Sequence, residues 1–253
     1  MPSAAVGLGA AGLLIGVLIG STGIGGVLLV PFLVHGMGFQ VQAAVAAALW
    51  SYLFSGLLAI ALYWRRGSIP ARAAMWLCAA AIPGAYLGAE ALAVVPGKVV
   101  EGLIAVVLLL GGLHTLRRAQ ETAARNRPPP GPWTLVGLGG LTGFASALLG
   151  AGGAFLLVPL LVALGEPVLL AVGLGQAIQV PISAVASVAN LRADRVDLAA
   201  GWTLAIALSL GIAVGTPLAH GLSQRALRRL VSLAMLVAAV MMLGRLTRLT
   251  RLF

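Results

Sequence analysis

Eight long apolar runs, separated by short stretches that hold most of the charged residues, make up this chain. They lie near residues 4–36, 41–64, 73–94, 99–116, 133–164, 168–190, 198–220 and 230–244. None of them alternates apolar and polar positions as a membrane β-strand does, and a bilayer core takes about 20 apolar residues in a helix. The pattern therefore predicts an all-α polytopic membrane protein with eight transmembrane helices.

The first and fifth runs are too long for one straight membrane helix. Each has about 32 residues, which would extend about 48 Å at 1.5 Å per residue. Both are interrupted by a glycine cluster, Gly20-Ser21-Thr22-Gly23-Ile24-Gly25-Gly26 in the first and Gly150-Ala151-Gly152-Gly153 in the fifth. Because a glycine costs about 1 kcal/mol against alanine in a helix, we expect both helices to break there. The pieces would be half-helices or re-entrant segments, and the distribution of charges favours one net crossing for each run.

The two halves of the chain repeat at an offset of 127 residues. Seven glycine pairs and two pairs of cations coincide at this shift: Gly16/Gly143, Gly23/Gly150, Gly25/Gly152, Gly26/Gly153, Gly38/Gly165, Gly84/Gly211, Gly88/Gly215, Arg65/Arg192 and Lys98/Arg225. Such self-similarity is typical of transporters. We therefore expect two four-helix repeats, residues 1–116 and 133–253, joined by a charged and proline-rich linker at 117–132. Four crossings in each half predict parallel halves, related by an axis along the membrane normal.

The composition excludes a water-soluble protein. Of the 253 residues, 60% are hydrophobic and 9% are charged, and the mean hydropathy is +1.07, whereas a soluble chain has about 25% charged residues. The single cysteine, Cys78, excludes a disulfide scaffold and a cysteine-built metal site. The sequence carries no motif of a nucleotide-binding or hydrolytic enzyme, so we expect no catalysis, no cofactor and no metal.

The net charge of +10 is better explained by membrane topology than by nucleic acid binding. If all eight runs cross, the side that holds the N-terminus receives twelve of the 16 Lys and Arg residues. The other side receives four, Lys98, Arg225, Arg228 and Arg229. The positive-inside rule then predicts that both termini and the linker lie in the cytoplasm.

The glycine clusters are candidate anion sites. Broken backbone at membrane depth is tolerated where it lines a cavity, and the free N–H groups at the start of a half-helix attract anions without lysine or arginine. The candidate residues are Ser21, Thr22, Gly23, Gly25, Gly26, Gly150, Gly152 and Gly153. The alternative is that these glycines only allow close helix packing, which is the interpretation we favour for Gly84/Gly88 and Gly211/Gly215.

The sixth run carries a polar face. Its members follow spacings of 3, 4, 4 and 3 and so share one side of a helix: Gln176, Gln179, Ser183, Ser187 and Asn190. Glutamines at membrane depth are costly unless they are paired or face water, so this face is expected to point into the bundle. We predict that Gln176, Gln179 and Ser183 bind substrate together with Ser51 of the second run. Hydrogen bonding between helices is the alternative.

The duplicated glycine clusters, each ahead of a Val-Pro pair, resemble those of the TauE/SafE family of sulfite exporters. The segments are GLLIGVLIGSTGIGGVLLVPFLV and GGLTGFASALLGAGGAFLLVPLLVALG, and the similarity covers both halves. It implies transport of small sulfur-containing anions, such as sulfite or organosulfonates, across the bacterial cytoplasmic membrane.

The sequence thus favours a secondary transporter with one anion site between the first and fifth runs. Two other functions stay open: a channel-like anion facilitator, and a membrane anchor subunit that transports nothing. The expected partners are the anionic substrate, the lipid bilayer and a coupling proton or sodium ion, but not nucleic acid. Glu90 is the candidate for proton coupling, although a solvated carboxylate at the membrane interface is the default interpretation of this residue.

Overall fold

The computed structural model describes residues 2–118, 130–164 and 166–221, with nine further residues between 229 and 244. These residues form helices and their connections, and no strand occurs among them. Most of the linker and seven of the 15 residues of the predicted eighth run lie outside the described residues. The helices are α1 (Pro2–Thr22), η1 (Gly25–Leu28), α2 (Leu29–Pro31), η2 (Phe32–Gly36), α3 (Val41–Trp64), α4 (Ala71–Val94), α5 (Gly97–Arg118), α6 (Pro132–Leu149), α7 (Gly153–Leu164), α8 (Val168–Arg192) and α9 (Leu198–Gly221).

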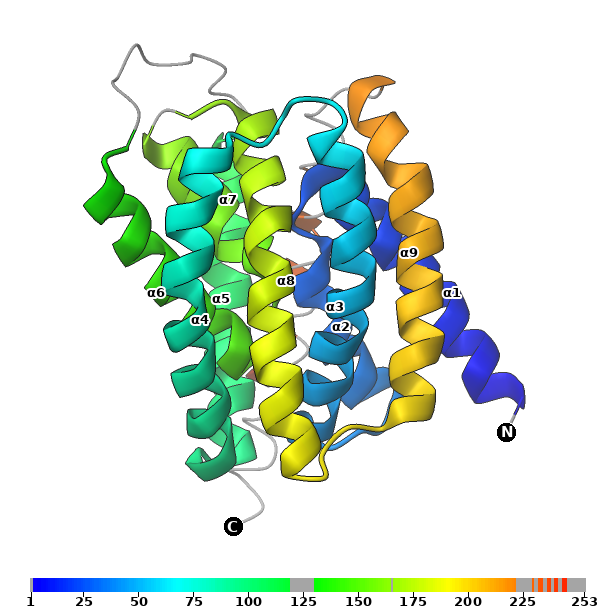
Figure 1. The fold of residues 1–253 in the computed structure, drawn as a ribbon. Coiled ribbons are helices and arrows are strands. Elements are labelled where there is room, and N and C mark those ends of the chain that lie inside the picture. The colour runs from blue at the N-terminus through cyan, green and yellow to red at the C-terminus, as the bar shows by residue number, and fades with distance from the viewer. Residues whose placement is uncertain are drawn as a thin grey trace.

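Five of these helices, α3, α4, α6, α8 and α9, are long and apolar enough to span a membrane. Their starts follow the repeat, because Val41 and Val168 are 127 residues apart and so are Ala71 and Leu198. Figure 1 shows α4, α8, α3 and α9 side by side, with α6 beyond α4 and α1 beyond α9. The central positions therefore belong to α3 and α8, the two helices with the most buried spans.

Both overlong runs are broken at their glycine clusters, as predicted. The first helix ends at Thr22, Gly23 adopts a φ of +74°, and the next twelve residues from Gly25 change from 3-10 through α to π geometry. The fifth run is interrupted by Gly150 and Gly152, with φ of +63° and +75°, before α7 begins. Glycine adopts this left-handed conformation without the steric cost that a Cβ would add.

The first helix and α3 run in the same direction. A Cβ added at Gly12 of α1 would lie 3.5 Å from Leu204 Cδ2 of α9, and one at Gly20 would lie 2.9 Å from Ile212 Cα. Eight residues further along α1, the contact lies eight residues further along α9, so the two helices are parallel.

The contacts of α3 show the same direction relative to α9. A Cβ added at Gly201 would lie 2.6 Å from the Trp50 ring, and the Arg66 guanidinium at the end of α3 donates to Thr216 O at 3.0 Å. Helices α1 and α3 are therefore parallel. The segment between them, residues 23–40, must then return the chain to the end where α1 began. Gly25 packs against α1 at this reversal, since a Cβ added there would lie 2.6 Å from Leu18 Cβ.

The second half contains the corresponding reversal. A Cβ added at Gly84 of α4 would lie 2.2 Å from Gly140 O of α6, and one at Gly88 would lie 2.2 Å from Phe144 O, so α4 and α6 are parallel. Further along the chain, Gly173 of α8 contacts the segment just before α4. The Cys78 thiol of α4 points to Ala177 O of α8 at 3.6 Å. Because α6 and α8 are both parallel to α4, residues 150–167 also form a return segment.

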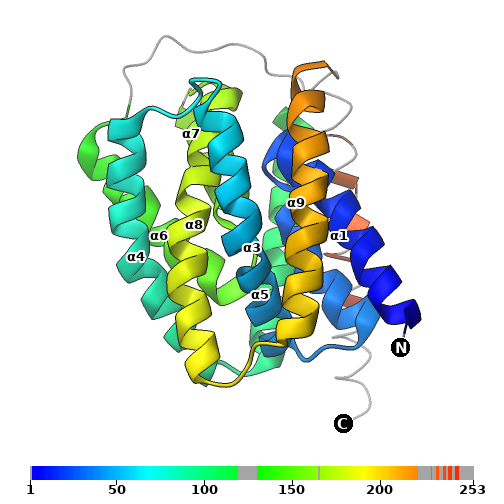
Figure 2. The same cartoon turned by 45° about the vertical axis from the view of Figure 1, so that its right-hand side comes forward.

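These directions correct two predictions. Residues 4–36 and 133–164 do not each make one net crossing; each is a hairpin that ends where it began. The halves are antiparallel, because α1, α3 and α9 run one way while α6, α8 and α4 run the other (Figures 1 and 2). The physical reason is that left-handed glycines allow a turn as readily as a kink.

The hairpins also change which connections share an end of the bundle. We call the end with the α3–α4 connection and the start of α6 the linker end. The other end, with the start of α1 and the α8–α9 connection, is the far end. The start of α1 therefore lies at the opposite end from the start of α6, so the prediction that the N-terminus and the linker share a side is wrong.

Glycines pack the outer helices against their neighbours, as expected for the two Gly-x-x-x-Gly pairs. Where Gly84 and Gly88 of α4 contact carbonyls of α6, their counterparts Gly211 and Gly215 of α9 would place a Cβ 2.3 Å from Leu13 O and 2.2 Å from Val17 O of α1. Close approach of this kind is how helices associate in lipid.

Candidate functional site

The two glycine clusters meet in the middle of the bundle. A Cβ added at Gly26 would lie 3.2 Å from Ala151 O, and one at Gly150 would lie 2.8 Å from Val30 Cγ2. The first cluster also contacts α7, since a Cβ at Gly23 would lie 3.5 Å from Ala154 Cβ. We call the residues 23–26 and 150–153 the tips of the two hairpins. The tips lie against one another between α3 and α8.

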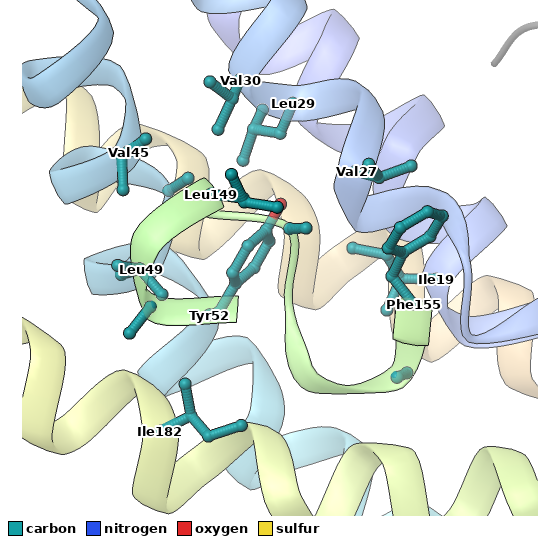
Figure 3. Close-up of a cluster of buried hydrophobic side chains, with 14 of the residues drawn as sticks. Ile19, Val27, Leu29, Val30, Val45, Leu49, Tyr52, Leu149, Phe155 and Ile182 are labelled. Atoms are coloured by element: carbon teal, nitrogen blue, oxygen red, sulfur yellow. The ribbon is translucent and has the colours of Figure 1, made fainter. Parts of the chain in front are cut away.

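Hydroxyl groups hold the carbonyls of both tips. Tyr52 donates to Gly26 O at 2.5 Å, and Ser146 donates to Gly152 O at 3.1 Å. Just before the first tip, Tyr63 donates to Gly20 O at 2.9 Å. Figure 3 shows the Tyr52 ring within the curve of the α6–α7 connection. The carbonyls of Gly26 and Gly152 are thus held by side chains. Three tip amides are also bonded, since Gly23 donates to Ile19 O at 2.9 Å, Ile24 to Thr22 Oγ1 at 3.3 Å and Gly150 to Ser146 O at 2.9 Å.

The second tip forms the start of a regular half-helix. In the twelve-residue helix α7, the amide of Phe155 donates to Gly152 O at 3.4 Å, and the first amides of a helix have no acceptor within the helix itself. They stand at its positive end, which favours a bound anion. The first tip lacks an equivalent helix because η1 and α2 are short, so the two tips are not equal as anion sites.

The polar face of α8 is buried, and most of it has no hydrogen-bond partner in the described part of the protein. The side chains of Gln176, Gln179, Ser183 and Ser187 are between 0 and 2% exposed. Both amide atoms of Gln176, Nε2 of Gln179 and both hydroxyls are unpartnered. Among the described residues these atoms make no interhelical hydrogen bond, which favours the substrate-binding hypothesis over the interhelical alternative.

One residue of this face reaches the second tip. A Cβ added at Gly152 would lie 3.1 Å from Gln179 Oε1, and one added at Gly56 of α3 would lie 3.5 Å from Gln179 Nε2. Gln179 therefore stands between the tip and α3. Gln176 and Ser183 lie one turn to either side of it on the same face.

The other predicted residues are placed as follows. The hydroxyls of Ser21, Thr22 and Ser51 donate to carbonyls of their own helices at 2.7–2.8 Å. Their oxygens keep a lone pair for another donor, and the amide of Ile24 already uses that of Thr22 at 3.3 Å. Gly25 faces α1 rather than the other tip. The structure thus brings together Gly23, Gly26, Gly150, Gly152, Gly153 and Gln179.

Tyr52 and Tyr63 were not among the predicted site residues. Tyr52 is the counterpart of Gln179 at the offset of 127, and Tyr63 is the counterpart of Asn190. Comparing the two central helices position by position would have pointed to both. Trp50 Nε1 and Ser55 Oγ, also on α3, are further buried groups without a partner among the described residues.

Two pockets lined by described residues lie outside the candidate site. One of about 430 Å³, with Arg72 and Glu166 at its edge, lies between α4, α6, α7 and α8 at the linker end. Another, of about 460 Å³, is a groove between α4 and α8 that contains Glu90 and Arg192. No predicted substrate-binding residue lines either of them. Glu90 is exposed there.

Comparison with known proteins identifies the family. The model of the family described as "Sulfite exporter TauE/SafE" matches residues 8–242, nearly the whole chain.

The chain belongs to the TauE/SafE sulfite exporter family.

No curated protein and no solved structure is detectably similar to the chain. Membership of TauE/SafE together with the apolar helices makes this a multi-pass membrane protein of a transporter family. The tips and the polar face of α8 are the candidate anion site of this family member.

Proposed function

We propose that this TauE/SafE protein is a secondary transporter of small sulfur-containing oxyanions such as sulfite or organosulfonates. The observation that carries the proposal is the meeting of two broken helices beside buried, unpartnered amides and hydroxyls. Paired broken segments are the usual substrate site of transporters built from repeats. The channel-like facilitator and the anchor subunit explain these unpartnered groups less well, since neither requires a buried polar site.

In this proposal the oxyanion binds at the second tip. The amides at the start of α7 donate to its oxygens, and the side-chain amides of Gln176 and Gln179 add donors from α8. Gly152 keeps the approach open, because any Cβ there would lie 3.1 Å from Gln179 Oε1. Further residues complete the site. The first half contributes Ser21, Thr22, Gly23, Gly26 and Ser51, and the second half contributes Ser183.

We propose two four-helix repeats, 1–116 and 133–253, each with a hairpin and three crossings, joined by the linker at 117–132. The corresponding contacts of Gly84 and Gly211 with neighbouring carbonyls support the repeat. Antiparallel repeats make alternating access geometrically simple, since moving one hairpin opens the site to one end and moving the other opens it to the opposite end.

The orientation follows from the cations near described helix ends. The α3–α4 and α5–α6 connections contain seven, Arg65, Arg66, Arg72, Arg117, Arg118, Arg125 and Arg127, and the α4–α5 and α8–α9 connections contain three, Lys98, Arg192 and Arg195. The positive-inside rule therefore favours a cytoplasmic linker end. We propose a bacterial cytoplasmic membrane protein in which α1 begins on the outside.

A proton is the proposed coupling ion, carried by His35 and Glu101. His35 Nε2 lies 3.2 Å from Glu101 Oε1, and their side chains are 11 and 14% exposed. The pair links the return segment of the first hairpin to α5. Its neighbours include Lys98, one turn earlier on α5, and the neutral amide of Gln42 on α3, which contacts Gly97.

The coupling proposal is tested by the pH dependence of uptake into proteoliposomes. Glu101→Gln should abolish the stimulation of transport by an imposed pH gradient, whereas Glu90→Gln, which alters the exposed earlier candidate, should keep it. Loss of the stimulation in Glu90→Gln but not in Glu101→Gln would assign the proton to Glu90. Stimulation that survives in both variants would exclude both carboxylates as the proton carrier.

Transport itself is tested by following labelled sulfite in the same vesicles. Gly152→Leu should abolish uptake, while Gly137→Leu, on the same hairpin at a position with open space around it, should transport normally. Because leucine is strained at a φ of +75°, Gly152→Asn is the second variant, since asparagine tolerates that conformation. Normal uptake by well-folded Gly152→Asn would remove the tip from the site.

The two other functions are separated by the same assay. Uptake against a gradient identifies a secondary transporter, and equilibration without accumulation identifies a facilitator. Absence of flux for every sulfur oxyanion tested, in protein that is folded and inserted, would contradict the proposed function and favour the anchor subunit.

A further inference from the structure

The two central helices have opposite chemistry at corresponding positions. The polar face of α8 consists of Gln176, Gln179, Ser183, Ser187 and Asn190, and subtracting 127 from each number gives Leu49, Tyr52, Gly56, Ile60 and Tyr63 on α3. Both sets are buried apart from Ile60, which is partly buried. Because α3 and α8 are antiparallel, the two faces extend from the tips toward opposite ends of the bundle.

The α8 face leads from the tips to the far end. From Gln176 to Asn190 it covers 14 residues, about 21 Å along the helix axis. Unpartnered groups occupy it at Gln176, Gln179, Ser183 and Ser187. At its end the Asn190 amide oxygen accepts from the Arg195 guanidinium at 3.4 Å. Unpartnered buried groups followed by a cation at the mouth are what a route for a hydrated anion requires.

The α3 face, which leads to the linker end, is closed. Its positions are aliphatic, glycine or tyrosine, and both tyrosine hydroxyls are used. Tyr52 donates to Gly26 O and Tyr63 donates to Gly20 O, so both bonds tie α3 to the broken first helix on either side of its break. The first hairpin cannot move away from α3 without losing them.

We propose that the α8 face lines one half of the translocation path, from the tips to the far end, and that Tyr52 and Tyr63 gate the other half. The cargo is a small oxyanion that passes along the amides and hydroxyls of α8 while the tyrosines keep the linker end shut. Release to the linker end requires both tyrosine hydrogen bonds to break. This inference rests on the proposed function for the nature of the cargo, but not for the position of the path.

The path is tested by labelling single cysteines in a Cys78→Ser background. A membrane-impermeant maleimide reacts only with thiols that water reaches. Ser183→Cys and Ser187→Cys should react when the reagent is applied at the far end, with protection by ethanesulfonate, which does not consume maleimide. Ile206→Cys on α9 is the control, because Ile206 is 61% exposed on the apolar surface and lines none of the pockets described above.

The gate is tested with Ile60→Cys, the counterpart of Ser187 on α3. With both tyrosines intact it should be unreactive from either end. Adding Tyr52→Phe or Tyr63→Phe should make it react from the linker end about tenfold faster, the effect expected when one hydrogen bond is lost from a closed–open equilibrium. Equal reactivity with and without the tyrosine hydroxyls would overturn the gate.

The remaining outcomes separate this inference from the proposed function. If Ser187→Cys reacts no faster than Ile206→Cys while the protein still transports sulfite, the path lies elsewhere and only this inference fails. If labelling follows the expected pattern but no sulfur oxyanion is transported, the path is retained and the proposed cargo is wrong. A Tyr63→Phe variant that does not fold would be replaced by Tyr52→Phe, which breaks the other bond alone.

Discussion

Replacing Gln176 by leucine is expected to stabilise the unliganded protein and to weaken anion binding at the same time. Both amide atoms of Gln176 are buried without a partner among the described residues. Leucine is the residue at the corresponding position of α3, Leu49, which is equally buried. The corresponding position of the other repeat therefore already accommodates a buried leucine.

The magnitude follows from the two unpartnered atoms. An unsatisfied buried donor or acceptor costs about 1–3 kcal/mol, so removing two should raise the free energy of unfolding by at least about 2 kcal/mol. For a chain of this size that corresponds to a Tm higher by about 4–8 °C. If Gln176 donates to the bound oxyanion, the affinity should fall by about 1–3 kcal/mol, or about 5- to 150-fold.

The assay is thermal unfolding of the purified protein in detergent, with and without a series of sulfite concentrations. Since a ligand that binds only the folded state raises its stability, one experiment gives both the apo Tm and the affinity. Asn190→Leu is the control on the same face. Asn190 Nδ2 donates to Ala186 O at 2.9 Å, and Asn190 Oδ1 accepts from the Arg195 guanidinium. Because Asn190→Leu removes both hydrogen bonds, it should lower the apo Tm.

Two results would refute this reasoning in different ways. A lower apo Tm for Gln176→Leu would mean that the side chain is satisfied in solution, by neighbours that the structure does not pair with it. A higher Tm with unchanged sulfite affinity would mean that the residue is dispensable for binding.

Two further predictions concern packing and topology. Gly211→Ala would place a Cβ 2.3 Å from Leu13 O and should lower the Tm by several degrees, since overpacking costs about 1–3 kcal/mol. Gly9→Ala, in open space on α1, should raise it slightly; a stable Gly211→Ala would contradict the close α1–α9 contact. In a Cys78→Ser background, an impermeant maleimide added to intact cells should label Ala193→Cys but not Ala71→Cys. Labelling of neither residue would restore the topology expected from sequence alone, which places both connections in the cytoplasm.

The sequence by itself determined the elements and the places where they break. Apolar runs gave the helices, because a bilayer accepts little else, and the glycine clusters gave breaks at Gly23 and at Gly150 to Gly152. The polar spacing on α8 gave a buried face, since glutamine at membrane depth must be shielded from lipid. The offset of 127 gave corresponding helix starts at Val41 and Val168.

Only the tertiary structure decided the direction of the chain after each break. A left-handed glycine permits both a kink and a reversal, and no local preference distinguishes them. The packing of Gly25 onto Leu18 and the parallel contacts of α1 and α3 with α9 selected the reversal. That choice inverted the second half and separated the linker from the start of α1. It also brought both Tyr52 and Gln179 to Gly152, because packing between distant segments, and not spacing along the chain, decides which side chains meet at the tips.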